Sequence, residues 1–240
     1  MMKTITHLDG EKMKKPVKIS IWTVLAIITA ILVTVSSIAV KQSFLRVFPL
    51  YISIFIMLLM ASLNRYAYLI GGLNSISYGL IFLHYNIIGS AISALCFSFP
   101  LQIASFIRWS KSSWKKTTVL KAMNSRTRAI NIILFIAIWA VYYIIIKKLG
   151  SASSVIDSVA SLIGMYVTVL QVLKFSEYTV LMIPSGIFNI LLYLSLIYKG
   201  DMEQLPFLIY SLFSFCCIVR SVFMARKIYN EQNTFTEENV

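Results

Sequence analysis

The chain has 240 residues, of which 58% are hydrophobic and only 13% are charged, and its formal net charge is +13. About a quarter of the residues in soluble domains are charged, so this composition excludes a sizeable soluble domain. Its apolar runs are long enough to cross a hydrocarbon core of about 30 Å as helices, and in lipid every backbone amide needs an internal partner. The sequence therefore predicts an all-α integral membrane protein that crosses the bilayer several times.

Eight membrane-spanning helices are predicted in chain order. The first follows a basic tail, as a signal peptide would, but it lacks a clear cleavage site, so we expect it to span the membrane. The predicted spans are residues 20–40, 44–63, 67–83, 87–107, 130–147, 155–174, 178–198 and 205–225.

The lengths of the connections predict the domain organisation. Three closely spaced helices are followed by a basic loop, a single helix and three more closely spaced helices. This pattern predicts two parallel three-helix bundles joined by a linker helix, an arrangement known from sugar carriers, with an extra N-terminal helix in front. The predicted parts are a basic tail with the extra helix (1–43), the first bundle (44–109), the basic loop with the linker helix (110–154), the second bundle (155–226) and a polar tail (227–240).

The basic residues are unevenly distributed over the loops. If successive loops alternate between the two sides of the membrane, 17 of the 22 Lys and Arg residues fall on one side. The positive-inside rule makes this side cytoplasmic, which predicts a multi-pass protein of the cell membrane with both termini and the 108–128 loop in the cytoplasm. Because the charges flank membrane spans, nucleic acid is excluded as a partner and the lipid bilayer is expected.

Catalytic and metal-binding patterns are missing from the sequence. His7 lies in the polar tail and His84 in a predicted turn, and there is no His-Glu-x-x-His, Gly-x-Ser-x-Gly or phosphate-binding glycine loop. The three cysteines lie in apolar segments, so we expect them to be packing residues rather than disulfides or metal ligands. We therefore expect no enzyme activity, no cofactor and no bound metal.

Two polar pairs recur in the two halves of the chain. Asn74 and Tyr78 lie in the second helix of the first predicted bundle, and Asn189 and Tyr193 repeat this spacing 115 residues later. Polar side chains at bilayer depth are costly and usually face a cavity, a partner or a substrate. Transporters built from repeats bind their substrates between the repeats. Chance similarity between apolar helices is the alternative explanation.

These polar residues predict a carrier with a site between the bundles. Amide and phenol groups suit a polyhydroxyl substrate, although ordinary packing remains the alternative for each aromatic ring and for most serines. No Asp, Glu or His lies at the centre of a predicted span, which predicts transport without proton coupling. The predicted substrate-binding residues are Asn74, Gln102 and Asn189 for hydrogen bonds and Tyr78, Phe99 and Tyr193 for stacking.

Several short motifs occur in a distinctive order. They are Gly71-Gly72-Leu73-Asn74-Ser75-Ile76-Ser77-Tyr78-Gly79, then Phe99-Pro100-Leu101-Gln102 ahead of Trp109, then Asp157-Ser158 opening a helix that is expected to end with Glu177. In order and spacing, residues 44–226 resemble the Pnu vitamin transporters, whose best-known members carry nicotinamide riboside.

The resemblance implies the three-one-three fold and facilitated diffusion of a nucleoside-like vitamin, which a cytoplasmic kinase traps by phosphorylation. It also allows a homotrimer, which members of the family can form. Where the family places Trp-x-x-Trp-x-x-x-Asn after its Glu, however, this chain has Thr179, Met182 and Gly186. Thiamine and deoxynucleosides therefore stay open as substrates, and a non-transporting immunity or sensor protein is the alternative from another class.

Overall fold

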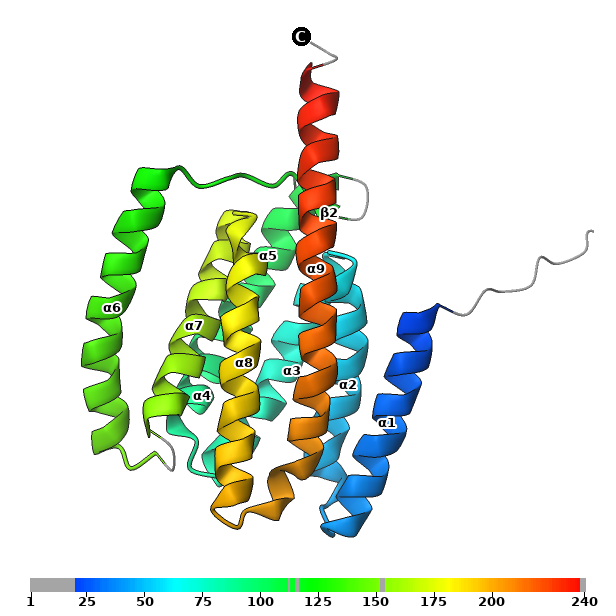
Figure 1. Cartoon of the computed structure of the whole chain (residues 1–240), viewed down its shortest axis with the longest axis vertical. Coiled ribbons are helices and arrows are strands. Elements are labelled where there is room, and N and C mark those ends of the chain that lie inside the picture. The colour runs from blue at the N-terminus through cyan, green and yellow to red at the C-terminus, as the bar shows by residue number, and fades with distance from the viewer. Residues whose placement is uncertain (1–19, 112, 115–116, 152–153, 238–240) are drawn as a thin grey trace, which may run out of the picture.

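The computed structural model describes residues 20–111, 113–114, 117–151 and 154–237 (Figure 1). The predicted basic tail lies almost entirely outside these residues. Within them, eight helices are long and apolar enough to cross a membrane. The elements are α1 (Ile21–Ala39), α2 (Phe44–Ala61), α3 (Tyr66–His84), α4 (Ile88–Ile92), the π-helix η1 (Ser93–Ser98), α5 (Phe99–Lys111), β1 (Ser113–Trp114), β2 (Thr117–Thr118), α6 (Ser125–Lys148), α7 (Ser154–Leu173), α8 (Glu177–Tyr198), the 3-10 helix η2 (Met202–Gln204) and α9 (Leu205–Glu237).

Local chemistry explains several helix boundaries. The hydroxyl of Ser20 accepts a hydrogen bond from the backbone N–H of Trp22 at the start of α1, and Asn124 caps α6 through the N–H of Thr127. Beyond the last residues of α6 and α8, Gly150 and Gly200 adopt positive φ angles of 77° and 96°. Only glycine adopts this conformation without strain, so both helices end there in tight turns.

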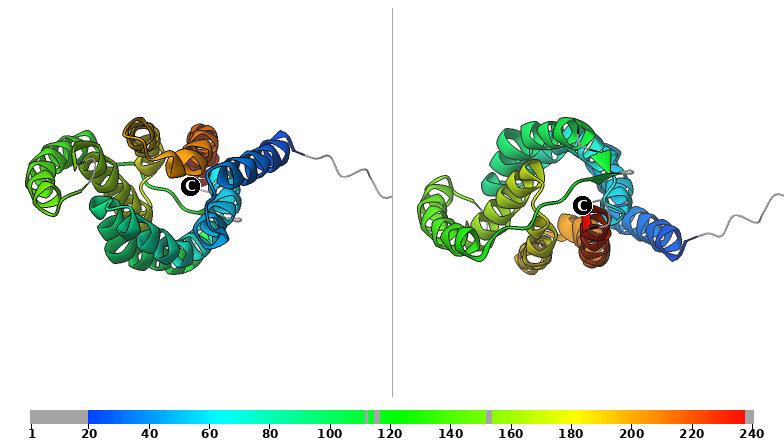
Figure 2. Two further views of the ribbon diagram at one scale, coloured as in Figure 1. Left: turned by 90° about the horizontal axis from the view of Figure 1, so that it is seen from below. Right: turned by 90° about the horizontal axis from the view of Figure 1, so that it is seen from above.

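Six of the spans form a ring in which each helix packs against the next. The order around the ring is α2, α3, the α4–α5 span, α7, α8 and α9, and α9 closes back onto α2. Helix α1 packs outside the ring on α9 and α2, and α6 packs outside on α7. Viewed along the helices, α1 and α6 project from opposite sides (Figure 2). Both carry many exposed aliphatic side chains, as helices that face lipid do.

The span between Ile88 and Lys111 changes its winding in the middle. Its central residues, Ser93–Ser98, form a π-helix that directly precedes Phe99 and Pro100. Proline has no N–H to donate and its ring crowds the carbonyl four residues earlier. A wider turn before the proline relieves this crowding, and such π-helical turns are frequent at functional sites.

Residues 117–124, between the start of β2 and α6, cross the top of the ring in Figure 1. We call this end of the molecule, where α5 ends and α8 begins, the basic end. The N–H of Lys121 donates to the carbonyl of Lys174, and its carbonyl accepts from the N–H of Ser176. The side-chain oxygen of Gln232 accepts from the N–H of Leu120. The predicted basic loop is therefore held against the α7–α8 turn and α9.

One boundary prediction was wrong. Glu177 begins α8 instead of ending the preceding helix, which stops at Leu173. Its carboxylate accepts from the N–H of Met123 at 2.8 Å and from Arg128 at 2.9 Å, so it holds the segment before α6. The predicted polar tail from residue 227 is helical as far as Glu237, because α9 continues beyond the membrane-length part.

A buried carboxylate joins the two halves of the ring at the opposite end. Asp157, in the first turn of α7, has no exposed surface. Its oxygens accept from the backbone N–H groups of Gly89 and Ser90 at 2.8 and 3.0 Å and from the hydroxyls of Ser90 and Ser151, both at 2.7 Å. The first N–H groups of any helix lack intrahelical partners, so Asp157 caps α4 from a helix more than sixty residues away in sequence.

We predict that Asp157→Asn lowers the free energy of unfolding by about 2 kcal/mol, because an amide nitrogen cannot accept from these donors and hydrogen bonds to a charged group are the stronger kind. Thermal unfolding of the purified protein in detergent measures the change. Asp201→Asn is the matched control, since Asp201 accepts a side-chain hydrogen bond from Gln204 at 3.0 Å. Equal stability of the two variants would contradict the capping role.

Candidate functional site

A cavity of about 320 Å³ lies inside the ring and is lined by all six ring spans except α2. This size falls in the range of about 300–1,000 Å³ that is usual for small-molecule sites. We call it the central cavity. It is lined by Ser75, Tyr78, Phe82, Ser90, Ser93, Ala94, Ser98, Gln102, Ala160, Ser161, Gly164, Val167, Met182, Ser185, Gly186, Asn189, Tyr193, Tyr210, Ser211, Ser214 and Ile218.

The lining is polar but uncharged. It includes eight serines and two amides, Gln102 and Asn189, and among the described residues no Asp, Glu, Lys or Arg contributes to it. The Gln102 amide donates to the hydroxyl of Ser75 at 3.4 Å, and the Asn189 amide donates to the carbonyl of Ser185 at 2.8 Å. Each amide therefore keeps hydrogen-bonding capacity for a ligand with hydroxyl and amide groups.

Glycine allows the helices to approach each other at this cavity. A Cβ atom added at Gly71 would collide with Oε1 of Gln102, which shows that the amide packs directly on the backbone of α3. A Cβ at Gly164 would meet nothing closer than the hydroxyl of Ser93 at 3.8 Å. The first glycine therefore positions Gln102, whereas the second leaves open space on the α7 wall.

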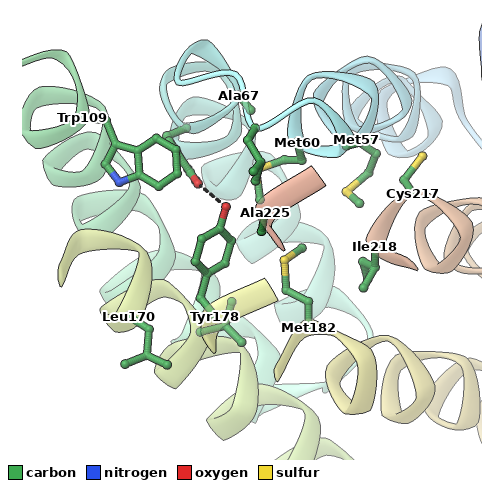
Figure 3. Close-up of a cluster of buried hydrophobic side chains, with 14 of the residues drawn as sticks. Met57, Met60, Ala67, Trp109, Leu170, Tyr178, Met182, Cys217, Ile218 and Ala225 are labelled. Atoms are coloured by element: carbon green, nitrogen blue, oxygen red, sulfur yellow. Dashed lines mark hydrogen bonds between the residues drawn. The ribbon is translucent and has the colours of Figure 1, made fainter. Parts of the chain in front are cut away.

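Aromatic residues form a buried layer near the basic end. Tyr68 on α3 donates its hydroxyl to that of Tyr178 on α8 at 3.2 Å, and the Trp109 indole on α5 donates to the carbonyl of Gln171 at 2.8 Å. Figure 3 shows the Tyr178 ring pointing across the cluster toward α3, with the hydroxyl pair as a dashed line. Tyr68, Trp109 and Tyr178 are at most 1% exposed. This layer joins α3, α5, α7 and α8 below the basic loop.

A second aromatic layer lies toward the opposite end. Tyr193 on α8 stacks on Phe207 of α9 with ring centroids 5.7 Å apart, and Tyr78 stacks on Phe82 within α3 at the same distance. The Tyr78 ring also meets Phe207 edge-on at 6.4 Å. Rings from α3, α8 and α9 thus meet between the cavity and that end of the molecule.

A polar network lies beyond this second layer. Arg46 at the start of α2 forms an ion pair with Glu203 at 2.9 Å and bonds to the ring of His84 at 2.6 Å. Tyr85 donates its hydroxyl to Glu203 at 2.8 Å. Partial burial, followed by this hydrogen bond, raises the pKa of Tyr85 to about 12, so the hydroxyl stays a donor. Gln42 donates to the Glu203 carbonyl, and the network ties α2 and the end of α3 to η2, which directly precedes α9.

The structure brings four of the six predicted site residues together. Tyr78, Gln102, Asn189 and Tyr193 line the central cavity from α3, α5 and α8. Phe99 is half-buried at the start of α5 and does not contribute to the lining. Substrate binding by these residues remains a prediction.

Asn74 faces helix α2 rather than the cavity. Its amide donates to the carbonyl of Pro49 at 3.0 Å and to the hydroxyl of Ser53 at 2.8 Å, and it is 5% exposed. Polar side chains that bond across membrane helices serve as packing contacts. This placement gives no support to the expectation that Asn74 bonds to the ribose or amide of a substrate.

The two asparagines of the apparent repeat lie at different positions along their helices. Asn74 lies eight residues after the first residue of α3, and Asn189 lies twelve after the first residue of α8. A difference of four residues is about one helical turn, or 6 Å along the axis. The recurring spacing therefore does not mark equivalent positions in the two helices.

Residues that sequence reasoning left out also line the cavity. Tyr210 and Ser211 contribute from α9, Ser161 and Gly164 from α7, and Met182 from α8. Sequence analysis treated most serines as small residues that let helices approach. The sequence does contain a pattern that indicates an inward face of α7. Asp157, Ser161 and Gly164 follow one another at intervals of four and three residues, which puts them on one side of a helix.

The comparisons with known proteins agree with this architecture. The family model described as nicotinamide mononucleotide transporter matches residues 43–227. No curated protein matches the chain by sequence. Among solved structures, the chain is similar to the crystal structure of the vitamin B3 transporter PnuC, with a TM-score of 0.76 and 20% sequence identity over 88% of this chain and 92% of that chain.

A ring of membrane-length helices around a polar cavity defines a polytopic membrane protein of the transporter class. Since the family model covers most of its length, the chain belongs to the nicotinamide mononucleotide transporter family, the PnuC family. The resemblance inferred over residues 44–226 is confirmed, as is the prediction that the chain is not an enzyme. Helix α1 precedes the residues that the family model matches.

We predict that Asn74→Ala lowers the free energy of unfolding by about 1 kcal/mol, because it removes two interhelical hydrogen bonds and such bonds in membranes average about 0.6 kcal/mol each. Unfolding in mixed micelles measures the change. Asn189→Ala is the matched control, since its amide donates within its own helix. If the control loses as much stability as Asn74→Ala, the packing role of Asn74 is wrong.

Proposed function

We propose that the protein mediates uncoupled, facilitated uptake of nicotinamide riboside or a similar nucleoside-like vitamin. The observation that carries this proposal is the central cavity itself, which offers amides, serine hydroxyls and tyrosine rings in a family of membrane transporters. A ribose presents hydroxyls to the amides, and a planar base can stack on Tyr78 or Tyr193. A positively charged base would gain a cation–π contribution from these rings. The structural neighbour is a vitamin B3 transporter.

The uncharged lining favours a substrate without a phosphate group. The family description names a mononucleotide, which carries a phosphate, and proteins bind phosphate through Arg, Lys or helix N-termini. Among the residues that the structure describes, no Lys or Arg lines the central cavity. A desolvated phosphate would therefore lack a counter-charge there, which supports a riboside over its phosphorylated form.

The same lining supports transport without proton coupling. Proton-driven carriers use Asp, Glu or His at membrane depth, and within the described residues none lines the cavity. The carboxylate of Asp157 is a candidate for carrying a proton, since it bonds to Ser90 of the lining. Its oxygens, however, already accept four hydrogen bonds from α4 and from Ser151. Net uptake then depends on a cytoplasmic kinase that phosphorylates the vitamin and so traps it.

The arrangement of helices suggests how the cavity opens. We interpret α2, α3 and the α4–α5 span as one bundle and α7, α8 and α9 as the second, with α6 as the linker and α1 as an extra helix. The contact between Tyr68 and Tyr178 joins the bundles at the basic end, and the ion pair of Arg46 with Glu203 joins them at the other. Rocking one bundle against the other would break these contacts alternately. We place the basic end in the cytoplasm of a cell membrane, and the homotrimer remains a prediction.

Uptake into proteoliposomes tests the substrate and the coupling. We expect saturable uptake of labelled nicotinamide riboside, no uptake of nicotinamide mononucleotide, and no change when a protonophore is added at fixed membrane voltage. Enclosing a nicotinamide riboside kinase with ATP should carry accumulation beyond the equilibrium level.

Uptake of the mononucleotide, or loss of uptake with the protonophore, would overturn the corresponding part of the proposal. Thiamine and deoxynucleosides belong in the same panel, because the cavity's amides and rings suit them as well. If the protein prefers either of them, the proposed carrier function stands and the proposed substrate changes.

Removal of the cavity amides tests the site. We predict that Gln102→Ala and Asn189→Ala each lower kcat/KM for uptake about tenfold, because each removes a hydrogen bond to the substrate worth about 1.4 kcal/mol. Asn230→Ala is the control, since Asn230 is an exposed amide on α9 that does not line the cavity. Unchanged uptake in both cavity variants would remove the central cavity as the substrate site.

A further inference from the structure

A second hollow lies outside the ring, between α6, α7, α8 and the distal part of α9, and measures about 500 Å³. We call it the lateral groove. None of the described residues that line it also lines the central cavity. It is lined by Met123, Arg128, Asn131, Ile132, Phe135, Ile163, Tyr166, Leu170, Ser176, Glu177, Thr179, Val180, Leu181, Ala225, Arg226 and Tyr229.

The groove exists because α6 stands away from the ring. Only 6% of the membrane-length window of α6 is buried. The helix is held by Glu177, which bonds to Arg128 at its start, and by Tyr142, which donates to the carbonyl of Gly89 at 3.1 Å. Between these two contacts Phe135 reaches Tyr166 on α7 at a centroid distance of 6.1 Å. The space toward α8 stays unfilled, and Figure 1 shows α6 at the edge of the molecule.

The walls of the groove open toward the membrane interior. Ile132 on α6 is 58% exposed and Val180 on α8 is 48% exposed. Deeper in the groove the lining is formed by Phe135, Ile163 and Leu181, which are all apolar. An aliphatic chain entering sideways from the bilayer would find apolar contacts along both walls.

Charge is concentrated at the basic end of the groove. Arg128 is neutralised by Glu177, with 2.9 Å between the paired atoms. Arg226 is exposed, and within the described part of the chain it forms no ion pair. Its neighbour Lys227 adds a further positive charge beside the groove. The end of the groove that faces the membrane surface is therefore positive, whereas the rest is apolar.

We propose that the lateral groove binds an anionic phospholipid, with its phosphate at Arg226 and one acyl chain between α6 and α8. An amphiphile with one negative head and an apolar chain matches both ends of the groove. A basic side chain near the membrane surface favours anionic over zwitterionic lipids by about 1 kcal/mol. The bound lipid fills the space that α6 leaves beside α8 and so supports the position of α6.

Native mass spectrometry of the purified full chain, titrated with phosphatidylglycerol and with phosphatidylcholine, tests the proposal. The unmodified protein should retain one phosphatidylglycerol per chain with about fivefold preference over phosphatidylcholine. Arg226→Gln should remove this preference. Lys227→Gln is the matched control, since it makes the same charge change one residue along the helix at a side chain outside the groove, and it should keep the preference.

Groove filling tests the acyl-chain position independently. Ile132→Trp places a bulky ring in the groove from an exposed position that tolerates it, and it should weaken retention of both lipids severalfold while the protein stays monodisperse. Equal loss of the lipid preference in Arg226→Gln and Lys227→Gln would mean that general surface charge causes the preference, and it would overturn the proposal. Retention that Ile132→Trp leaves intact, or competition by inorganic phosphate alone, would also overturn the proposal. Because the measurement involves no transport, failure here leaves the proposed uptake function untouched.

Discussion

Hydrocarbon offers no hydrogen bonds, and this constraint organises the whole molecule. Every polar group at membrane depth must find a partner inside the protein or face an enclosed polar space. The ring of six spans provides both solutions. Its interfaces hold the bonded groups, such as Asn74 against α2, and its centre holds the serines and amides of the cavity. Helices α1 and α6, which carry many exposed aliphatic residues, lie outside it.

Polar contacts between the halves of the chain lie at both ends of the ring. Asp157 caps α4 and Arg46 pairs with Glu203 at one end, while Tyr68 bonds to Tyr178 at the other. These contacts differ in strength. A buried carboxylate with four donors holds its partners more firmly than a single bond between two hydroxyls. The halves are thus joined by a charged cap at Asp157, and at the basic end by uncharged bonds, that of the tyrosine pair and that of the Trp109 indole to the carbonyl of Gln171.

The two hollows of the molecule differ in chemistry as well as in position. The central cavity is lined by neutral polar groups and aromatic rings, which suits a hydrophilic, uncharged or cationic solute. The lateral groove is apolar along its walls and positive at its end, which suits a lipid. Glu177 borders the groove and also holds Met123, so the docked segment before α6 and the groove share one carboxylate. A molecule in the groove and the docked segment before α6 would therefore both contact the side chain of Glu177.

Membrane insertion, span number and family could be derived from the sequence, because they depend on local composition and on the order of short motifs. The run of apolar residues from 44 to 61 is long enough to span wherever it packs. Part of the cavity lining could be derived as well: Gln102, Asn189, Tyr78 and Tyr193 line the cavity, since polar groups in such spans tend to face inward, and their binding of a substrate stays a prediction. Asn74 faces α2 instead, because the rotation of a helix about its axis depends on neighbours that the sequence does not specify. Only the tertiary structure decided that the basic loop packs on the α7–α8 turn and that α6 lies outside the ring. Both features depend on contacts between segments that are remote in the chain.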